Sequence, residues 1–182
     1  MKKLIMAIAV AALAAATQAA VIAWKTGTGN QVYLMNSTDR AGGLAVYLFA
    51  DTVTQDSVLE AVRSGAKLSS LAYKATSTTQ STGAINSSFT ANAGDTFSGY
   101  FAILATVDGA DYLYISSVAS ATAPTTGTGT AIYKEKAASQ LAASSGTYSG
   151  AGWYTTAAVP EPTSAMLLVL GVAALALRRK RA

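Results

Sequence analysis

The side chains of this chain that could carry acid–base chemistry or bind a metal ion are a few carboxylates. Asp108 and Asp111 flank a tight turn, and Asp51, Asp56 and Glu60 gather near an expected helix start. Two carboxylates about 5–10 Å apart can hydrolyse a glycosidic bond, and several can hold calcium through their oxygens. Aspartate is also common at turns and helix starts, where it bonds to the local backbone. We favour this local role and predict no catalytic residue and no metal site.

The chain contains neither histidine nor cysteine. Their absence excludes Ser-His and Cys-His nucleophiles, thiol redox chemistry and disulfide bonds. It also removes nearly all ligands for zinc, haem and iron–sulfur clusters. We therefore expect a protein that is not an enzyme and that uses no cofactor. A small hydrolase that works with carboxylates alone is the catalytic alternative.

Three aromatic residues are candidates for stacking against a ligand: Tyr112, Tyr114 and Trp153. Tyr112 and Tyr114 are separated by one residue, so they share one face of a strand. Rings exposed on a sheet could bind the apolar face of a sugar. The same residue types also serve in core and cross-strand packing. Both interpretations stay open from the sequence, and packing is the one we favour.

The body that must position these side chains, residues 20–158, has the pattern of a β-rich domain. Short apolar or alternating runs are separated there by turn-forming Gly, Asn, Asp and Ser. The run at 44–49 is apolar on both faces, which predicts a central strand. The clearest hairpin joins 97–107 to 112–118. Strands are expected at residues 31–35, 44–49, 67–76, 85–90, 97–107, 112–118, 131–134 and 146–156.

One short helix is expected at about residues 54–64, because apolar residues recur there at helical spacing. Capping-box patterns begin at Thr52 and at Ser57, and Gly65 can end the helix. Residues 136–143 also fit a helix. Strands separated by turns, with one inserted helix, predict a mainly β fold, either an antiparallel β-sandwich or an open barrel. We expect an N-terminal signal helix and a C-terminal hydrophobic helix to flank this domain.

The formal net charge of +4 comes from the two ends of the chain. The terminal segments hold six basic residues and Glu161, a sum of +5, so +4 less +5 leaves −1 for residues 20–158. The body therefore has no excess of positive charge with which to attract a polyanion. We expect no nucleic-acid partner.

The N-terminus has the three parts of a secretory signal peptide. Met1-Lys2-Lys3 is basic, residues 4–16 are apolar, and Thr17-Gln18-Ala19 is a small-x-small cleavage site. We predict a signal peptide over residues 1–19 with cleavage after Ala19; cleavage after a neighbouring alanine, Ala16 or Ala20, is the alternative. The partners implied are the export translocon and signal peptidase, and the secreted domain is the body that follows.

The C-terminal segment, residues 159–182, consists of a spacer, an apolar run and a basic end. The apolar run predicts a transmembrane helix at about 164–177, which is short for a hydrocarbon core of roughly 30 Å. Two prolines favour extended backbone in the spacer, which is formed by Val159, Pro160, Glu161 and Pro162. Four basic residues form a membrane stop that favours the cytoplasmic side: Arg178, Arg179, Lys180 and Arg181.

Together, these three parts resemble the PEP-CTERM sorting signal of Gram-negative bacteria, over residues 159–182 only. The resemblance implies processing by an exosortase, a membrane-embedded cysteine transpeptidase-like enzyme, after a transient hold in the inner membrane. It also implies a final place at the cell surface or in an exopolysaccharide-rich biofilm matrix. We expect an exported surface or extracellular-matrix protein whose molecular activity the sequence leaves open. A carbohydrate-binding module or adhesin of such a matrix is the alternative.

Overall fold

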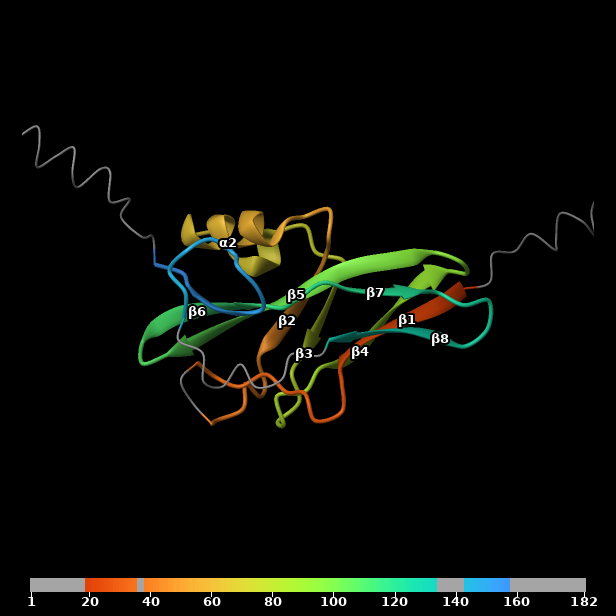
Figure 1. The fold of residues 1–182 in the computed structure, drawn as a ribbon, viewed down its shortest axis with the longest axis horizontal. Helices are drawn as coiled ribbons and strands as arrows, with labels where there is room; N and C mark the ends of the chain where they lie inside the picture. Colours follow the sequence, from red (N-terminus) through yellow and green to blue (C-terminus); the bar gives the residue numbers. More distant parts are fainter. Residues whose placement is uncertain (1–18, 36–37, 134–142, 158–182) are drawn as a thin grey trace, which may run out of the picture.

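A computed structural model describes residues 19–35, 38–133 and 143–157 (Figure 1). Within these ranges the chain is mainly β, as predicted, and contains one α-helix. The expected signal helix, the hydrophobic helix at 164–177 and most of the possible helix at 136–143 lie outside the described residues. In chain order, the elements are β1 (Ala19–Thr26), β2 (Ala45–Ala50), α2 (Gln55–Arg63), a 3-10 turn (Leu68–Ser70), β3 (Ala75–Thr78), β4 (Asn86–Asn92), β5 (Thr96–Val107), β6 (Ala110–Ile115), β7 (Ala119–Thr122), β8 (Thr128–Tyr133) and β9 (Gly152–Thr155).

The strands form two sheets. The smaller sheet has the order β4-β1-β8, and the larger has the order β3-β2-β5-β6-β9, with β7 paired to the first part of β5. β1 runs antiparallel to β4 but parallel to β8, so the prediction of purely antiparallel pairing is wrong for this pair. Between β1 and β8 the chain crosses to the other sheet and returns. No short hairpin therefore imposes an antiparallel direction on the pair.

A shared apolar core joins the two sheets. β1 contributes Ile22 and Trp24, which are fully buried, and the facing strand β5 contributes Phe101 and Ile103. Alternate residues of β1 are buried, as expected for a strand with one face on a core. The core also receives the largest buried rings of β6, β8 and β9: Tyr114, Tyr133 and Trp153.

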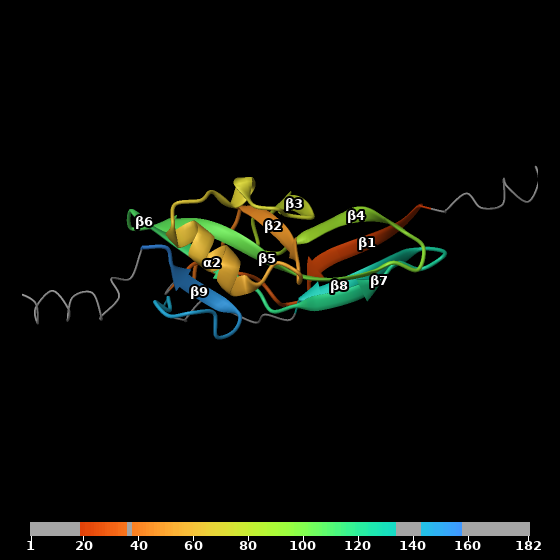
Figure 2. The same ribbon diagram turned by 90° about the horizontal axis from the view of Figure 1, so that it is seen from above.

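A second core lies on the other face of the larger sheet, beneath α2 (Figure 2). Val58, Leu59 and Val62 of the helix are buried there, and Tyr100 of β5 faces them. β5 therefore buries successive side chains on opposite faces, as does the central strand β2. This explains the doubly apolar run at 44–49 and confirms that it forms a central strand.

The boundaries of α2 agree with the predicted helix at 54–64. Its N-cap is Thr54, whose hydroxyl accepts the backbone N–H of Ser57 at 3.2 Å. Thr52 and Ser57 were the predicted capping residues, and both predictions are wrong. Gly65 follows the helix with a φ of +92°, a left-handed conformation that glycine adopts without strain.

Three expected strands differ from the structure. The strand expected at 146–156 is limited to β9, because residues 146–151 form no strand. Residues 31–35 contribute only one isolated bridge, between Tyr33 and Arg40, and no longer strand pairs with them among the described residues. Residues 67–76 begin with the 3-10 turn and become extended only where β3 starts. Two observed strands, β1 and the short β7, are not among the expected ones. β1 adjoins the apolar signal segment.

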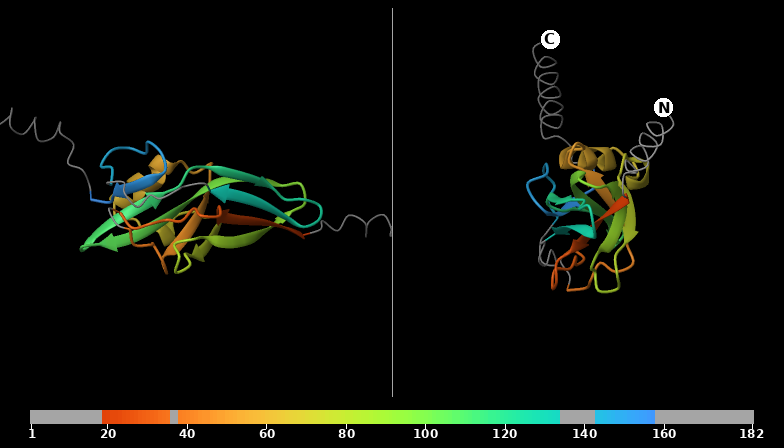
Figure 3. Two further views of the ribbon diagram at one scale, coloured as in Figure 1. Left: turned by 60° about the horizontal axis from the view of Figure 1, so that its bottom comes forward. Right: turned by 90° about the vertical axis from the view of Figure 1, so that its right-hand side faces the viewer.

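The first and last described residues lie at opposite ends of the domain. β1 starts at one end, whereas the chain leaves β9 at the other (Figures 1 and 3). At the β9 end, the Thr156 hydroxyl donates to the Asp111 carbonyl at 2.8 Å, next to the β5–β6 turn. The C-terminal tail therefore begins far from the β4–β5 turn, which lies at the β1 end.

Candidate functional site

The three aromatic residues proposed for ligand stacking do not form an open platform. Tyr114 and Trp153 are each only 1% exposed, and their rings meet edge to face with centroids 5.4 Å apart. The Trp153 indole N–H donates to the Tyr33 carbonyl at 3.0 Å. Tyr112 is half-buried against the same core. Tyr114 and Trp153 therefore pack in the core, the role that their residue types favour, whereas Tyr112 remains partly exposed.

Three of the five carboxylates noted in the sequence have recorded partners. Asp111 accepts the Thr106 hydroxyl at 2.6 Å, and Asp56 accepts the backbone N–H of Tyr148 at 2.7 Å. Glu60 pairs with Arg63 on the surface of α2. Asp108 occupies the β5–β6 turn with a φ of +51°. Among the described residues, no group of three or more acidic side chains could hold a metal ion.

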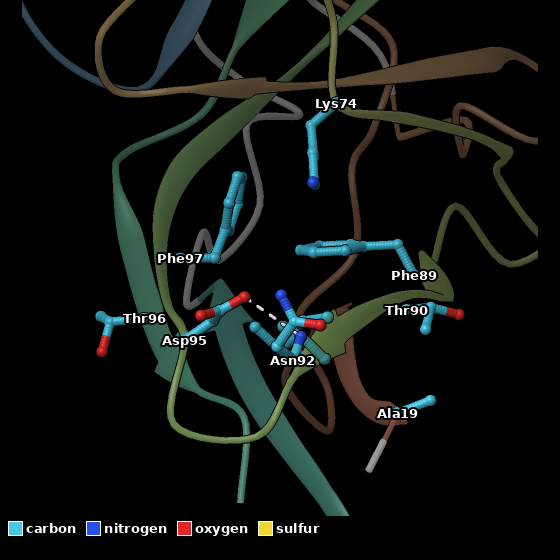
Figure 4. Close-up of a pocket in the computed structure, with 10 residues that line it drawn as sticks. Ala19, Lys74, Phe89, Thr90, Asn92, Asp95, Thr96 and Phe97 are labelled. Atoms are coloured by element: carbon cyan, nitrogen blue, oxygen red, sulfur yellow. Dashed lines mark hydrogen bonds between the residues drawn. The ribbon is translucent and has the colours of Figure 1, made fainter. Parts of the chain in front are cut away.

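Several hollows in the surface of the described domain could hold a small ligand. One of about 530 Å³ lies beside the end of α2, and one of about 330 Å³ follows the loop from Lys25 to Gln31. A third, of about 470 Å³, combines a cation, a carboxylate and two aromatic rings (Figure 4). We call this one the Lys74 pocket. Its lining consists of Ala19, Ile22, Lys74, Phe89, Thr90, Ala91, Asn92, Asp95, Thr96 and Phe97.

The Lys74 pocket lies where the chain passes from one sheet to the other. Phe89 stands on β4 of the smaller sheet, and Phe97 stands on β5 of the larger one. The turn between these strands is closed by the backbone N–H of Asn92, which donates to the Asp95 carboxylate at 3.1 Å. Gly94 supports this turn with a φ of +89°. The pocket walls are therefore held by paired strands and a bonded turn.

The ring of Phe89 contacts both Phe97 and Lys74 in this pocket (Figure 4). Phe89 and Phe97 pack edge to face with ring centroids 5.0 Å apart. The Lys74 ammonium lies 5.1 Å from the centre of the Phe89 ring, a cation–π contact. No carboxylate pairs with Lys74 within the described ranges, where the ion pair found is Arg63–Glu60. Among the described residues Lys74 thus has no carboxylate partner, and its exposed ammonium lies over the ring of Phe89.

Sequence reasoning did not identify this pocket. Phe89, Phe97 and Lys74 come from three separate segments, and none of them belongs to a recognisable motif. The available signal is the alternating burial of β4, which places Phe89 on the inner face. Finding the pocket required knowing that β4 and β5 belong to different sheets.

The predicted processing residues lie at or beyond the ends of the described chain. Ala19, the predicted cleavage residue, is the first residue of β1. The sorting residues Val159, Pro160, Glu161 and Pro162, together with the basic residues Arg178 to Arg181, lie outside the described ranges. The helices that the structure does describe are all too short or too polar to cross a membrane.

Comparison with protein families gives one match. Residues 158–181 match the PEP-CTERM protein-sorting motif, so the chain carries this motif at its C-terminus. The motif indicates that the protein is exported and sorted to the cell surface by an exosortase-type enzyme. Neither the curated proteins nor the solved structures gave a match. The motif therefore assigns a route, and it does not assign an activity to the β-rich body.

Proposed function

We propose that this protein is a non-enzymatic component of the cell surface or extracellular matrix of a Gram-negative bacterium. The observation that carries the proposal is the PEP-CTERM motif at residues 158–181. The body supports it in a negative way, because the whole sequence lacks histidine and cysteine and so lacks the commonest nucleophile systems. A β-rich body without histidine or cysteine suits a structural or binding role.

In this proposal the tail passes through a membrane-anchored intermediate before exosortase processing. The translocon and signal peptidase act first, at the N-terminus, and the apolar segment at 164–177 then holds the protein in the inner membrane. Residues 158–163 link that segment to the described body, and six extended residues span at most about 20 Å. The body would therefore stay near the membrane surface, with its β9 end towards the membrane and its β1 end directed away.

The test of sorting is fractionation of cells with and without the exosortase. We expect the protein in surface and medium fractions of the parent strain and in the inner-membrane fraction of the deletion strain. A variant with Pro160→Ala, Glu161→Ala and Pro162→Ala should behave in the parent strain like the wild-type protein in the deletion strain. An unchanged distribution in both comparisons would refute sorting by this tail.

Carbohydrate binding is the second candidate function, and it also fits a matrix adhesin. The observation that favours it is the Lys74 pocket, where aromatic rings and polar groups line one hollow. This site replaces the stacking group of Tyr112, Tyr114 and Trp153. Glycan-array binding by the exported protein tests this role, and silence on acidic and neutral glycans alike would exclude it.

A further inference from the structure

We propose that the Lys74 pocket binds an acidic saccharide, namely a sugar ring that carries a carboxylate, such as a uronic acid. Three features of the pocket each select one part of this ligand. The Lys74 ammonium would pair with the carboxylate, and the phenylalanine rings would pack against the apolar face of the sugar. Asp95 and Asn92 would form hydrogen bonds with its hydroxyl groups. This inference rests on carbohydrate binding, the second candidate function, and names the class of sugar; it is independent of the sorting tail.

The positive charge of the Lys74 ammonium favours an anionic ligand. A lysine has three N–H donors, and the ring of Phe89 is the contact that the structure gives this ammonium. Figure 4 shows the Lys74 side chain extending between Phe89 and Phe97 rather than away from the pocket. Because none of the described carboxylates pairs with it, a bound carboxylate would supply charge-assisted hydrogen bonds without displacing an internal partner.

The two phenylalanine rings favour a ligand that has an apolar surface next to its anionic group. Both rings are half-buried, so each is anchored in the core and still exposes part of its surface to the pocket. The C–H face of a sugar ring is apolar and suits such a surface, because burying it removes apolar area from water. Ile22, fully buried beneath them, continues the apolar lining.

Asp95 argues against a simple anion or a polyanion. Its Oδ2 accepts the backbone N–H of Asn92, and Oδ1 has no recorded hydrogen bond within the described residues, so it could accept from a sugar hydroxyl. A phosphate or a nucleic acid would place further negative charge close to this carboxylate, which is unfavourable. A sugar acid can instead direct its carboxylate to Lys74 and its hydroxyls to Asp95 and the Asn92 amide (Figure 4). The arrangement therefore favours a ligand with one charge and several hydroxyls.

The position of the pocket suits a ligand outside the cell. Ala20 and Ala91 pair near the start of β1, at the end of the domain opposite to the exit of the tail, and this pair remains after cleavage behind Ala19. If the tail is held in or near the membrane, this end faces away from it. The pocket volume of about 470 Å³ is within the usual range of small-molecule sites.

The test is calorimetry on the protein purified from cells that export it, with oligogalacturonate as the probe. We expect oligogalacturonate to bind, its methyl ester to bind at least tenfold more weakly, and high salt to weaken the binding. Lys74→Gln should reduce the affinity about tenfold or more. Lys67→Gln is the matched control, because it removes an exposed lysine outside this pocket, and it should leave the affinity unchanged.

Three results would overturn the proposal: no binding of oligogalacturonate, equal binding of its methyl ester, or equal loss in the two lysine variants. Equal affinity for acetate or for anionic lipid vesicles would also overturn it, because either would reduce the site to a general anion contact. Phe97→Leu tests the ring contribution, and its thermal unfolding must first match that of the wild-type protein. Lys74 is exposed, so Lys74→Gln decides the matter even if Phe97→Leu does not fold. Fractionation of Lys74→Gln should remain normal, so failure of binding and failure of sorting are distinguishable.

Discussion

At the scale of single residues, Gly99 of β5 connects the packing of the larger sheet with the Lys74 pocket. A Cβ atom at this position would lie 2.2 Å from the Phe49 carbonyl oxygen and 2.6 Å from Cζ of Phe97. The Gly99 carbonyl also accepts the buried Tyr133 hydroxyl at 3.1 Å. The absence of a side chain thus lets β2 approach closely and lets the Phe97 ring lie along the strand.

Replacing Gly99 with alanine should therefore destabilise the protein. We expect Gly99→Ala to lower the free energy of unfolding by about 1–3 kcal/mol, as forced insertions into packed cores do. Urea denaturation measures this loss. Gly146→Ala is the control, because its Cβ would lie 3.6 Å from the Ser144 hydroxyl, an ordinary contact. Equal stability of the two variants would contradict the close approach at Gly99.

Tyr100 gives a prediction about pH. Its hydroxyl donates to the Val53 carbonyl at 2.8 Å, and the side chain is fully buried. Burial raises the pKa of Tyr100 well above its ordinary value, and the charge of Tyr148 raises it further. The folded protein therefore keeps a proton that the unfolded chain loses near pH 10. Stability from this group is complete below about pH 10 and is lost as the pH rises above it.

We expect urea midpoints to fall more steeply above about pH 10 in the wild-type protein than in Tyr100→Phe. At pH 8 the variant should be less stable by about 1 kcal/mol, because it lacks the hydrogen bond to Val53. The other tyrosines are common to both proteins, so the difference between the two pH profiles isolates Tyr100. Parallel profiles from pH 8 to pH 11 would contradict the raised pKa.

At the scale of elements, Arg63 holds α2 against the last described segment of the chain. Its Nε donates to the Thr155 carbonyl at 3.1 Å, and Nη2 donates to Ser145 and Gly146 carbonyls at 3.0 and 2.9 Å. The side chain is 9% exposed, so these bonds are shielded from water, whereas its ion-pair partner Glu60 is 61% exposed. The end of the helix thus fixes β9, from which the tail leaves.

Arg63→Gln should lower the free energy of unfolding by about 2–3 kcal/mol, because it leaves carbonyls without their charged donor. In Arg63→Gln, the substitution should speed the exchange of the β9 amide hydrogens more than that of the β5 amide hydrogens. Hydrogen-exchange mass spectrometry can resolve this difference. The control Glu60→Gln breaks an exposed ion pair and should change stability by less than about 1 kcal/mol. If the two variants are equally stable, α2 does not secure β9 through Arg63.

The predicted elements that agree with the structure are those specified by nearby residues. Local periodicity and turn residues specify two of these elements, the helix at 54–64 and the hairpin at 97–107 and 112–118. All of these signals lie close together along the chain. The strand expected at 31–35 failed because strand propensity needs a partner, and Tyr33 has one only at Arg40. The parallel pairing of β1 with β8 depends on the path of the whole chain.

The candidate site was harder to predict than the fold. The residue types of Tyr114 and Trp153 suggest a stacking role. A ring can contact a ligand only if it is exposed, however, and both of these rings are buried in the core. The Lys74 pocket depends on the meeting of two sheets, with Phe89 and Phe97 on different ones. No spacing along the chain encodes that meeting.

At the scale of the whole molecule, the predicted targeting segments lie at the two termini and the β-rich body lies between them. The basic and apolar segments stand at the two termini, and residues 20–158 carry a net charge of −1, since +4 for the chain less +5 for its ends is −1. The described domain places its first and last residues at opposite ends.

Intact-mass spectrometry can test whether this protein is exported and then sorted through its PEP-CTERM tail. Protein from the parent strain should begin at Ala20 and should lack the basic end, Arg178 to Arg181. Protein from a strain without the exosortase should also begin at Ala20 but should retain that end. Equal masses from the two strains, or an intact basic end in the parent strain, would contradict the account.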